Sequence, residues 1–237
     1  PTQAWPSVVE QTKKDHADKV AALEKYSFTL TGDPFDHQGV RTDGVAIVKH
    51  GKLIYEGYNR GYTPDMPHLA WSVSKNYLHG LVGIAQRTKG LQLSDSICKY
   101  LTLESKDACK LTINDLLNWA SGLDWAEQYE GGAYQQSSVL AMLYGVGHAD
   151  MANFVANHAF RDKPGDTMSY STGDTTLLMG VMGGVFKDEG PEFPWKVLFE
   201  PLGMKSVVWE HDAKGTYVGG SYVYATPRDF AKYGFLY

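Results

Sequence analysis

The sequence predicts an α/β region combined with a mostly helical region, and three observations favour this fold class. Two apolar, β-branched runs flank a His-Gly-Lys turn in residues 44–57, which is typical of a β-hairpin. Between residues 75 and 201 little of the sequence looks like sheet. Trp209 and residues 217–224 then return to an extended pattern. We therefore expect an antiparallel sheet flanked by helices, together with a helical domain.

The composition is that of a globular protein with a sizeable core. The chain has 237 residues, of which 43% are hydrophobic and 21% are charged. A length of this size allows one large domain or two interleaved ones. Lys and Arg number 22 against 27 Asp and Glu, and no long basic patch occurs, so a nucleic-acid partner is not expected. No apolar run approaches the roughly 18–20 residues of a membrane span.

The first half of the chain contains the elements with the clearest patterns. Residues 8–23 are charged and intermittently apolar, as in a surface helix. The hairpin at 44–57 follows, and then a loop at 61–68 with two prolines. Residues 74–89 have only a narrow polar face and end in Arg-Thr-Lys-Gly, which predicts a central, largely buried helix.

The second half is mostly helical until its last thirty or so residues. We expect helices at 111–119, with Thr112 as N-cap, and also at 139–144, 151–158, 175–186 and 227–236. The final helix has no stop signal, so we expect the C-terminal part of the sheet to lie outside this chain. The predicted regions are 1–65 (helix and hairpin of the α/β domain), 66–214 (helical domain) and 215–237 (return to the α/β domain).

The two cysteines leave two interpretations open. Cys98 and Cys109 flank a short polar stretch, and they could close a small disulfide loop or remain reduced as two small apolar side chains. Spacing alone does not decide between these. No C-x-x-C or H-x-x-x-H pattern is present, so no metal site is predicted.

The start of the predicted central helix contains a Ser-x-x-Lys pattern, Ser72 and Lys75. Residues three apart lie on one face of a helix, so these two side chains can touch. A serine hydroxyl needs a nearby base to become a nucleophile, and a neutral amine can be that base. The pattern is short and recurs by chance. A lysine directed into an otherwise apolar helix is nevertheless costly without a function, which favours a catalytic pair.

Several segments then follow in an order that resembles a known superfamily. They read W-S-V-S-K at 71–75, L-L-N-W-A-S-G-L at 116–123, K-P-G-D-T-M-S-Y-S-T at 163–172, P-L-G-M at 201–204 and A-T-P-R-D-F-A-K-Y-G at 225–234. In this order they resemble the serine β-lactamase and penicillin-recognising superfamily. The branch that they resemble contains class C β-lactamases, family VIII esterases and 6-aminohexanoate-dimer hydrolases. The resemblance covers nearly the whole chain and implies the β-lactamase/transpeptidase-like fold.

The resemblance implies roles for six residues and no cofactor. Ser72 would be the acylated nucleophile, Lys75 its partner in proton transfer, and Tyr170 a general acid/base on the leaving group. Trp119, Tyr129 and Thr172 would contact the substrate. For Tyr129, a solvent-facing loop tyrosine is an equal alternative.

The chain departs from the superfamily pattern at two places. Thr172 stands where a side-chain amide is frequent, and its single hydroxyl offers less than an amide's separate donor and acceptor. A third motif, similar to K-T-G or H-x-G, is not found up to Tyr237. The strand that carries this motif also supplies one oxyanion-hole N–H, and loss of such a donor costs about 2.7–4 kcal/mol in rate.

The leading hypothesis is a serine hydrolase that cleaves a small ester or linear amide through an acyl-enzyme. A D-amino-acid peptidase or a weak β-lactamase is the nearest alternative. A catalytically silent protein of the same fold, binding a peptide or glycan, is the alternative from another class. The resemblance and the cysteine pair favour a periplasmic or secreted location, with a cytoplasmic one as the alternative. The oligomeric state does not follow from the sequence.

Overall fold

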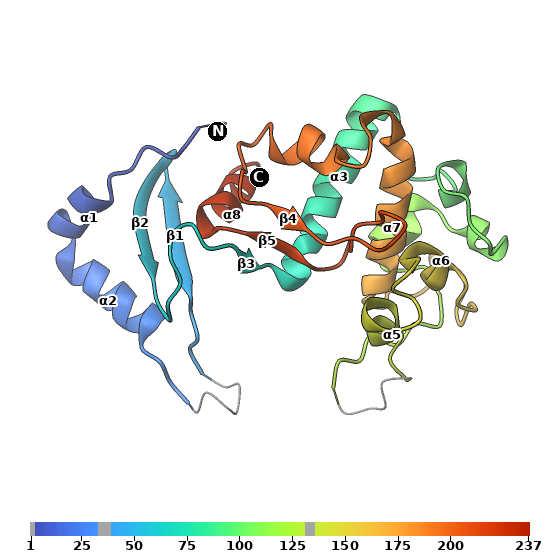
Figure 1. Ribbon diagram of the computed structural model, residues 1–237, viewed down its shortest axis with the longest axis horizontal. Coiled ribbons are helices and arrows are strands. Elements are labelled where there is room, and N and C mark those ends of the chain that lie inside the picture. Colours follow the sequence, from blue (N-terminus) through green and yellow to red (C-terminus); the bar gives the residue numbers. More distant parts are fainter. Residues whose placement is uncertain (1–2, 33–38, 131–135) are drawn as a thin grey trace. The chain divides into compact units, whose positions relative to one another are not determined.

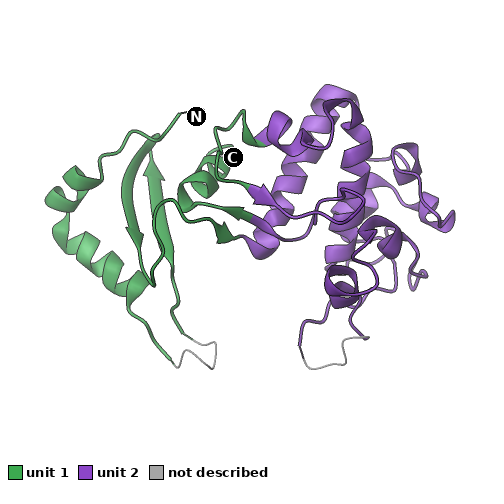
Figure 2. Cartoon of the chain, in the orientation of Figure 1, with its two compact units in different colours: residues 1–69, 199–207, 224–237 green, residues 70–198, 208–223 purple. Residues whose placement is uncertain are grey.

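The computed structural model describes residues 3–32, 39–130 and 136–237, and the chain folds into two compact units (Figure 2). Unit 1 comprises residues 1–69, 199–207 and 224–237, and unit 2 comprises residues 70–198 and 208–223. The predicted regions, 1–65, 66–214 and 215–237, did not include the return of residues 199–207 to unit 1. The antiparallel hairpin, its flanking helices and the helical unit agree with the predicted fold class.

The predicted hairpin forms the centre of unit 1 (Figure 1). Strands β1 (Gly44–Lys49) and β2 (Lys52–Tyr58) pair in antiparallel register, with Gly44 opposite Tyr58. Both turn residues have positive φ, 51° at His50 and 73° at Gly51, as the tight twisted hairpin turn requires. The prediction for residues 44–57 is therefore confirmed.

The N-terminal helix is interrupted, unlike the single helix predicted for 8–23. Helix α1 (Val9–Asp15) ends at His16, whose φ of −135° is not helical, and α2 (Ala17–Phe28) continues five residues beyond the predicted end. Residues 6–8 run parallel to β2, since the Leu53 N–H donates to the Pro6 carbonyl at 3.0 Å. This pairing lets Trp5 and Val9 pack on Leu53 in a small core, which anchors α1 to the hairpin.

Unit 1 also contains a short strand pair and the last helix. Strand β3 (His68–Leu69) pairs antiparallel with β5 (Val223–Ala225) at its last two residues. Helix α8 (Pro227–Gly234) begins after the N-cap Thr226, with proline in its first turn. Its Arg228 donates two hydrogen bonds of 2.7 Å to Glu56 on β2. This fork joins the C-terminal helix to the hairpin.

Extended structure near the C-terminal end is shorter than predicted. Strand β4 covers only Val208–Trp209, and of the predicted run 217–224 only the last two residues belong to β5. Tyr217, at the start of the run, forms an isolated antiparallel bridge with His211. The prediction was wrong for the middle of the run, because residues 218–221 form a turn closed by the Ser221 N–H on the Val218 carbonyl at 3.2 Å.

Unit 2 is built around helix α7 (Thr172–Val185), which is buried along nearly its whole length. Figure 1 shows α3 (Ser74–Lys89) and α6 (Met151–Ala156) beside α7 in this unit. The shorter helices are α4 (Ile113–Leu117) and α5 (Ser138–Tyr144). The central helix at 74–89 and the Thr112 cap are confirmed, and α7 begins three residues before the predicted start.

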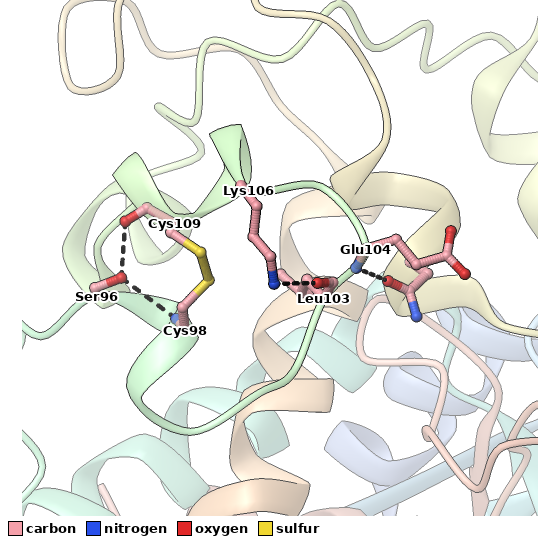
Figure 3. The surroundings of a disulfide bond; sticks show 7 residues. Ser96, Cys98, Leu103, Glu104, Lys106 and Cys109 are labelled. Atoms are coloured by element: carbon pink, nitrogen blue, oxygen red, sulfur yellow. Dashed lines mark hydrogen bonds between the residues drawn. A yellow bond between two sulfur atoms is a disulfide. The ribbon is translucent and has the colours of Figure 1, made fainter.

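The two cysteines form a disulfide in unit 2 (Figure 3). The bond joins the short helical turns η2 (Ile97–Lys99) and η3 (Asp107–Lys110), with the two Cα atoms 5.2 Å apart. The Ser96 hydroxyl supports both ends, since it donates to the Cys109 carbonyl and accepts from the Cys98 N–H. The sequence left open whether the two cysteines are reduced or form a disulfide, and in the structure they form the disulfide.

Neither a membrane span nor a metal cluster occurs in the part of the chain that the structure describes. None of the described helices has the length and apolar character needed to cross a membrane. Likewise, no three described His, Cys, Asp or Glu side chains are grouped so as to hold a metal ion.

Candidate active site

Ser72 lies directly before the first turn of α3. The N–H of Ala70 donates to the Val223 carbonyl at 2.7 Å, and residues Trp71–Val73 then form a 3₁₀ turn that leads into the helix. The buried Ser74 hydroxyl accepts from the Val223 N–H, which fixes the start of α3. Negative charge that develops on Ser72 would therefore lie at the positive end of a 16-residue helix.

Lys75 is buried, with 4% of its surface exposed, and its ammonium nitrogen reaches three oxygens. Nζ lies 3.4 Å from Ser72 Oγ, 3.2 Å from Thr172 Oγ1 and 2.8 Å from the Gly220 carbonyl. A lysine ammonium has three donors and no acceptor, so this cage accommodates all three protons. The predicted contact of Ser72 with Lys75 is present, and it is part of a larger network.

The segment before α7 places Tyr170 on the same serine. The Tyr170 hydroxyl donates to Ser72 Oγ at 2.8 Å, and Lys75 Nζ lies 4.8 Å from the centre of the Tyr170 ring. Trp119 supports this position, because its ring centre is 4.7 Å from that of Tyr170 and its carbonyl accepts from the Ser169 N–H. The three predicted catalytic side chains thus meet at one oxygen atom.

Glu127 is a member of this network for which the sequence offered no signal. Its carboxylate accepts from the Trp125 indole at 2.6 Å, from the Tyr129 hydroxyl at 2.7 Å, and from the Thr172 N–H and hydroxyl at 2.9 and 2.5 Å. The Thr172 hydroxyl in turn accepts from Lys75. A carboxylate is therefore joined to the lysine through a single hydroxyl group, that of Thr172, which lies 45 residues after Glu127 in the sequence.

The predicted substrate contacts Tyr129 and Thr172 lie side by side. Their hydroxyls are 3.3 Å apart, and the Tyr129 ring is about half exposed. Burial of the phenol, together with the Glu127 carboxylate, raises the pKa of Tyr129 above its ordinary value. Tyr129 is therefore a neutral hydrogen-bond donor at neutral pH.

Gly220 is needed where the backbone approaches Lys75. A Cβ at this position would lie 2.6 Å from Thr172 Cγ2, closer than real Cβ contacts, and 3.2 Å from Lys75 Nζ, where the lysine would have to shift. Glycine thus allows its carbonyl to accept from the lysine.

A second buried carboxylate joins the segment 116–123 to the start of α7. Asp174 accepts from the hydroxyls of Ser121 and Ser171 at 2.8 and 3.0 Å, and Ser171 caps the helix. Burial raises the pKa of Asp174 to about 6, although these hydrogen bonds act in the opposite direction. The hydrogen bonds of Asp174 thus hold the chain segments that carry Trp119 and Tyr170 next to each other.

The large cavities lie away from the six predicted site residues. Two cavities of about 580 and 590 Å³ lie within unit 1 and one of about 500 Å³ lies within unit 2, and none of the three is lined by a predicted site residue. The chemistry of the candidate site therefore rests on side-chain geometry in unit 2.

Residues 17–236 match the Beta-lactamase family. The chain belongs to this family. Its members are mostly serine hydrolases, and some are not catalytic. The superfamily resemblance inferred from the five segments is thereby confirmed, as is the fold that it implied.

Solved structures share this fold at low sequence identity. A protein described as a 6-aminohexanoate-dimer hydrolase from Bacillus anthracis is 20% identical, with a TM-score of 0.67 over 82% of this chain and 53% of that one. FmtA from Staphylococcus aureus is 15% identical, with a TM-score of 0.64 over 99% of this chain and 68% of that one. A β-lactamase/D-alanine carboxypeptidase from Yersinia pestis is 14% identical, with a TM-score of 0.62 over 96% and 67%.

The chain spans about half the length of the first of these structures. No curated protein matches the chain.

Proposed function

We propose that the chain carries the chemistry of a serine hydrolase that cleaves a small ester or linear amide through an acyl-enzyme on Ser72. One observation carries the proposal: Lys75 Nζ and the Tyr170 hydroxyl both lie within hydrogen-bond reach of Ser72 Oγ, at 3.4 and 2.8 Å. A nucleophile with a base at this distance, held in turn by a third group, is the general arrangement of covalent hydrolases. Membership of the Beta-lactamase family supports the same class.

The geometry supplies a proton path for each step. In the reactive state the pair holds one proton fewer, with Tyr170 as a phenolate beside the Lys75 cation, whose Nζ lies 4.8 Å from the ring centre. As Ser72 Oγ bonds to the substrate carbonyl carbon, its proton passes to the phenolate. The C–O or C–N bond then breaks as Tyr170 gives this proton to the leaving group. Water next attacks the acyl carbon and gives a proton to Tyr170, which passes it to Ser72 Oγ as the acid leaves.

The surroundings of Thr172 support an ester or a simple amide as substrate. Its hydroxyl already contacts Lys75, Glu127 and Tyr129. It therefore has little capacity left to bind the side-chain amide of a β-lactam. Ester hydrolysis is therefore expected to be faster than β-lactam hydrolysis.

A serine-directed probe tests the proposal. The protein is treated with a fluorophosphonate and its intact mass is measured, with Ser72→Ala as the control. Hydrolysis of p-nitrophenyl acetate, a linear amide, a D-alanyl-D-alanine peptide and nitrocefin is then compared. We expect one adduct that the control lacks, and ester hydrolysis above the other activities. A folded protein without an adduct would overturn the proposal and favour a silent binding protein. Faster peptide or nitrocefin turnover would reassign the substrate.

A further inference from the structure

Three aromatic residues beside the candidate site have a backbone conformation that bulky residues rarely adopt. Trp71, Trp119 and Tyr222 have φ values of 46°, 51° and 63°. In the part of the chain that the structure describes, only two other non-glycine residues have positive φ, and both lie in unit 1. Left-handed conformations of large side chains cost free energy, and they cluster where function requires them.

Two of these residues form an aromatic wall next to the nucleophile. Trp71 directly precedes Ser72, and its ring centre lies 6.2 Å from that of Tyr222. Tyr222 is in turn 6.5 Å from Tyr144, nearly perpendicular to it, and the two hydroxyls are hydrogen-bonded. We call Trp71, Tyr144 and Tyr222 the aromatic wall.

Two of the three wall rings are exposed, so packing alone does not account for them. Trp71 is 58% exposed and Tyr144 is 60% exposed, while Tyr222, which contacts both, is partly buried. A ring that served only the core would be buried, and a glycine would satisfy the backbone at residues 71 and 222 without strain. The other member of the trio, Trp119, packs on Tyr170, which contacts the same serine. Of these rings, Tyr170 contacts the Ser72 hydroxyl, and Trp71 adjoins Ser72 in the chain. Tyr222 follows two residues after Gly220, whose carbonyl accepts from Lys75, so the wall adjoins the same network.

We propose that the aromatic wall is a substrate subsite that binds an aryl group attached near the scissile bond. This inference rests on the proposed hydrolase function and narrows its substrate class. Aromatic rings prefer offset or edge-to-face contact with other aromatic rings, with a gain beyond that of buried area alone. The tilted and perpendicular rings of the wall offer such contacts to a planar aryl group. They offer less to a saturated ring of similar size.

The test compares substrates that differ only in that ring. Methyl phenylacetate is paired with methyl cyclohexylacetate for the acyl side, and benzyl acetate with cyclohexylmethyl acetate for the leaving-group side. Turnover is followed by proton release. We expect kcat/KM to favour the aryl ester about 3- to 10-fold in one of the pairs.

Variants locate the preference in the wall. Tyr222→Gly removes the ring and relieves the backbone, so the thermal midpoint should hold while the aryl preference falls towards one. Tyr144→Leu tests the same wall from a helix, without a backbone change. Tyr26→Ala, an exposed tyrosine in unit 1, should leave the ratio unchanged.

The two proposals fail separately. An unlabelled wild-type protein in the fluorophosphonate experiment would remove the hydrolase function itself. Labelling of Ser72 together with ratios near one in both ester pairs, or a preference that survives both wall variants, would overturn the aryl subsite alone.

Discussion

Replacing Glu127 with glutamine tests whether this carboxylate organises the candidate site. The change keeps the shape of the side chain but removes its charge and one acceptor. The Trp125 indole and the Thr172 N–H can only donate, so the glutamine oxygen should take the place of Oε2, which they contact. The amide NH₂ then faces the hydroxyls of Tyr129 and Thr172, which must turn to accept.

The expected cost follows from these four contacts. Hydrogen bonds to a charged group contribute about 1.5–3 kcal/mol, against about 0.5–1.5 kcal/mol for neutral ones. The two N–H contacts each lose about 1 kcal/mol, and the reoriented hydroxyls roughly break even. We therefore expect Glu127→Gln to lower the free energy of unfolding by about 2 kcal/mol, or Tm by about 4–8 °C for a chain of this size.

The effect on turnover should exceed the effect on binding. The Thr172 hydroxyl accepts from Lys75 while donating to Glu127, so reversal of its second bond disturbs the lysine without removing any catalytic group. We expect kcat for the best ester to fall on the order of 10-fold with little change in KM.

The assay is ester hydrolysis together with thermal unfolding, with Glu130→Gln as the matched control. That residue is an exposed glutamate three positions further along, so its change should affect neither quantity. Equal Tm and kcat in Glu127→Gln and the wild type would refute the view that this carboxylate holds the site.

Three further outcomes follow from the structure. Tyr170→Phe keeps the ring contact with Trp119 but removes the hydroxyl, so kcat/KM should fall about 10²- to 10⁴-fold while the fold holds; a rate near that of the wild type would exclude Tyr170 as acid/base. The fold raises the pKa of Asp174 from 3.8 to about 6, so the protonated carboxyl group stabilises the folded state relative to the unfolded state. This contribution to the free energy of unfolding is fully present below pH 3.8 and is lost as the pH rises through 6. The unfolding free energy of the wild type minus that of Asp174→Asn, from urea titrations, should therefore drop by about 2 kcal/mol between pH 4 and 7, and parallel pH profiles would contradict this. Replacing Cys98 and Cys109 with serine should cost about 3 kcal/mol in urea unfolding, and dithiothreitol should destabilise the wild type alone.

The elements with local signals were predictable from the sequence. The hairpin at 44–57 and helix α3 follow from strand and helix periodicity over neighbouring residues, and the Thr112 cap follows from hydrogen bonds within three positions. The break at His16 carries no such signal, because no proline or glycine marks it. The early start of α7 depends on the Ser171 cap, which lies before the range predicted for this helix.

In the candidate site, too, the contacts between residues near in sequence were predictable and the long-range contacts were not. Ser72 and Lys75 are three residues apart, so their contact can be inferred from helix geometry alone. Tyr170 lies 98 residues from Ser72, and only the resemblance to a superfamily singled it out. Glu127 belongs to no short pattern and acts through Thr172, so no reasoning on spacing would find it. Long-range polar networks depend on the tertiary fold, which local propensity does not encode.

The backbone conformation of the strained aromatic residues also indicates where the functional region of unit 2 lies. Within the same segment as Trp119, Gly122 also has positive φ, at 71°, and there the chain uses the residue that adopts this conformation freely. At Trp119, Trp71 and Tyr222 the chain instead has a large ring, against local preference. Since glycine would remove the strain at each position, the rings must contribute something that the backbone alone does not need. Their shared feature is proximity to the network around Ser72. Residues that adopt a conformation against their local preference are expected at functional sites, so these three support a functional role for the region around Ser72.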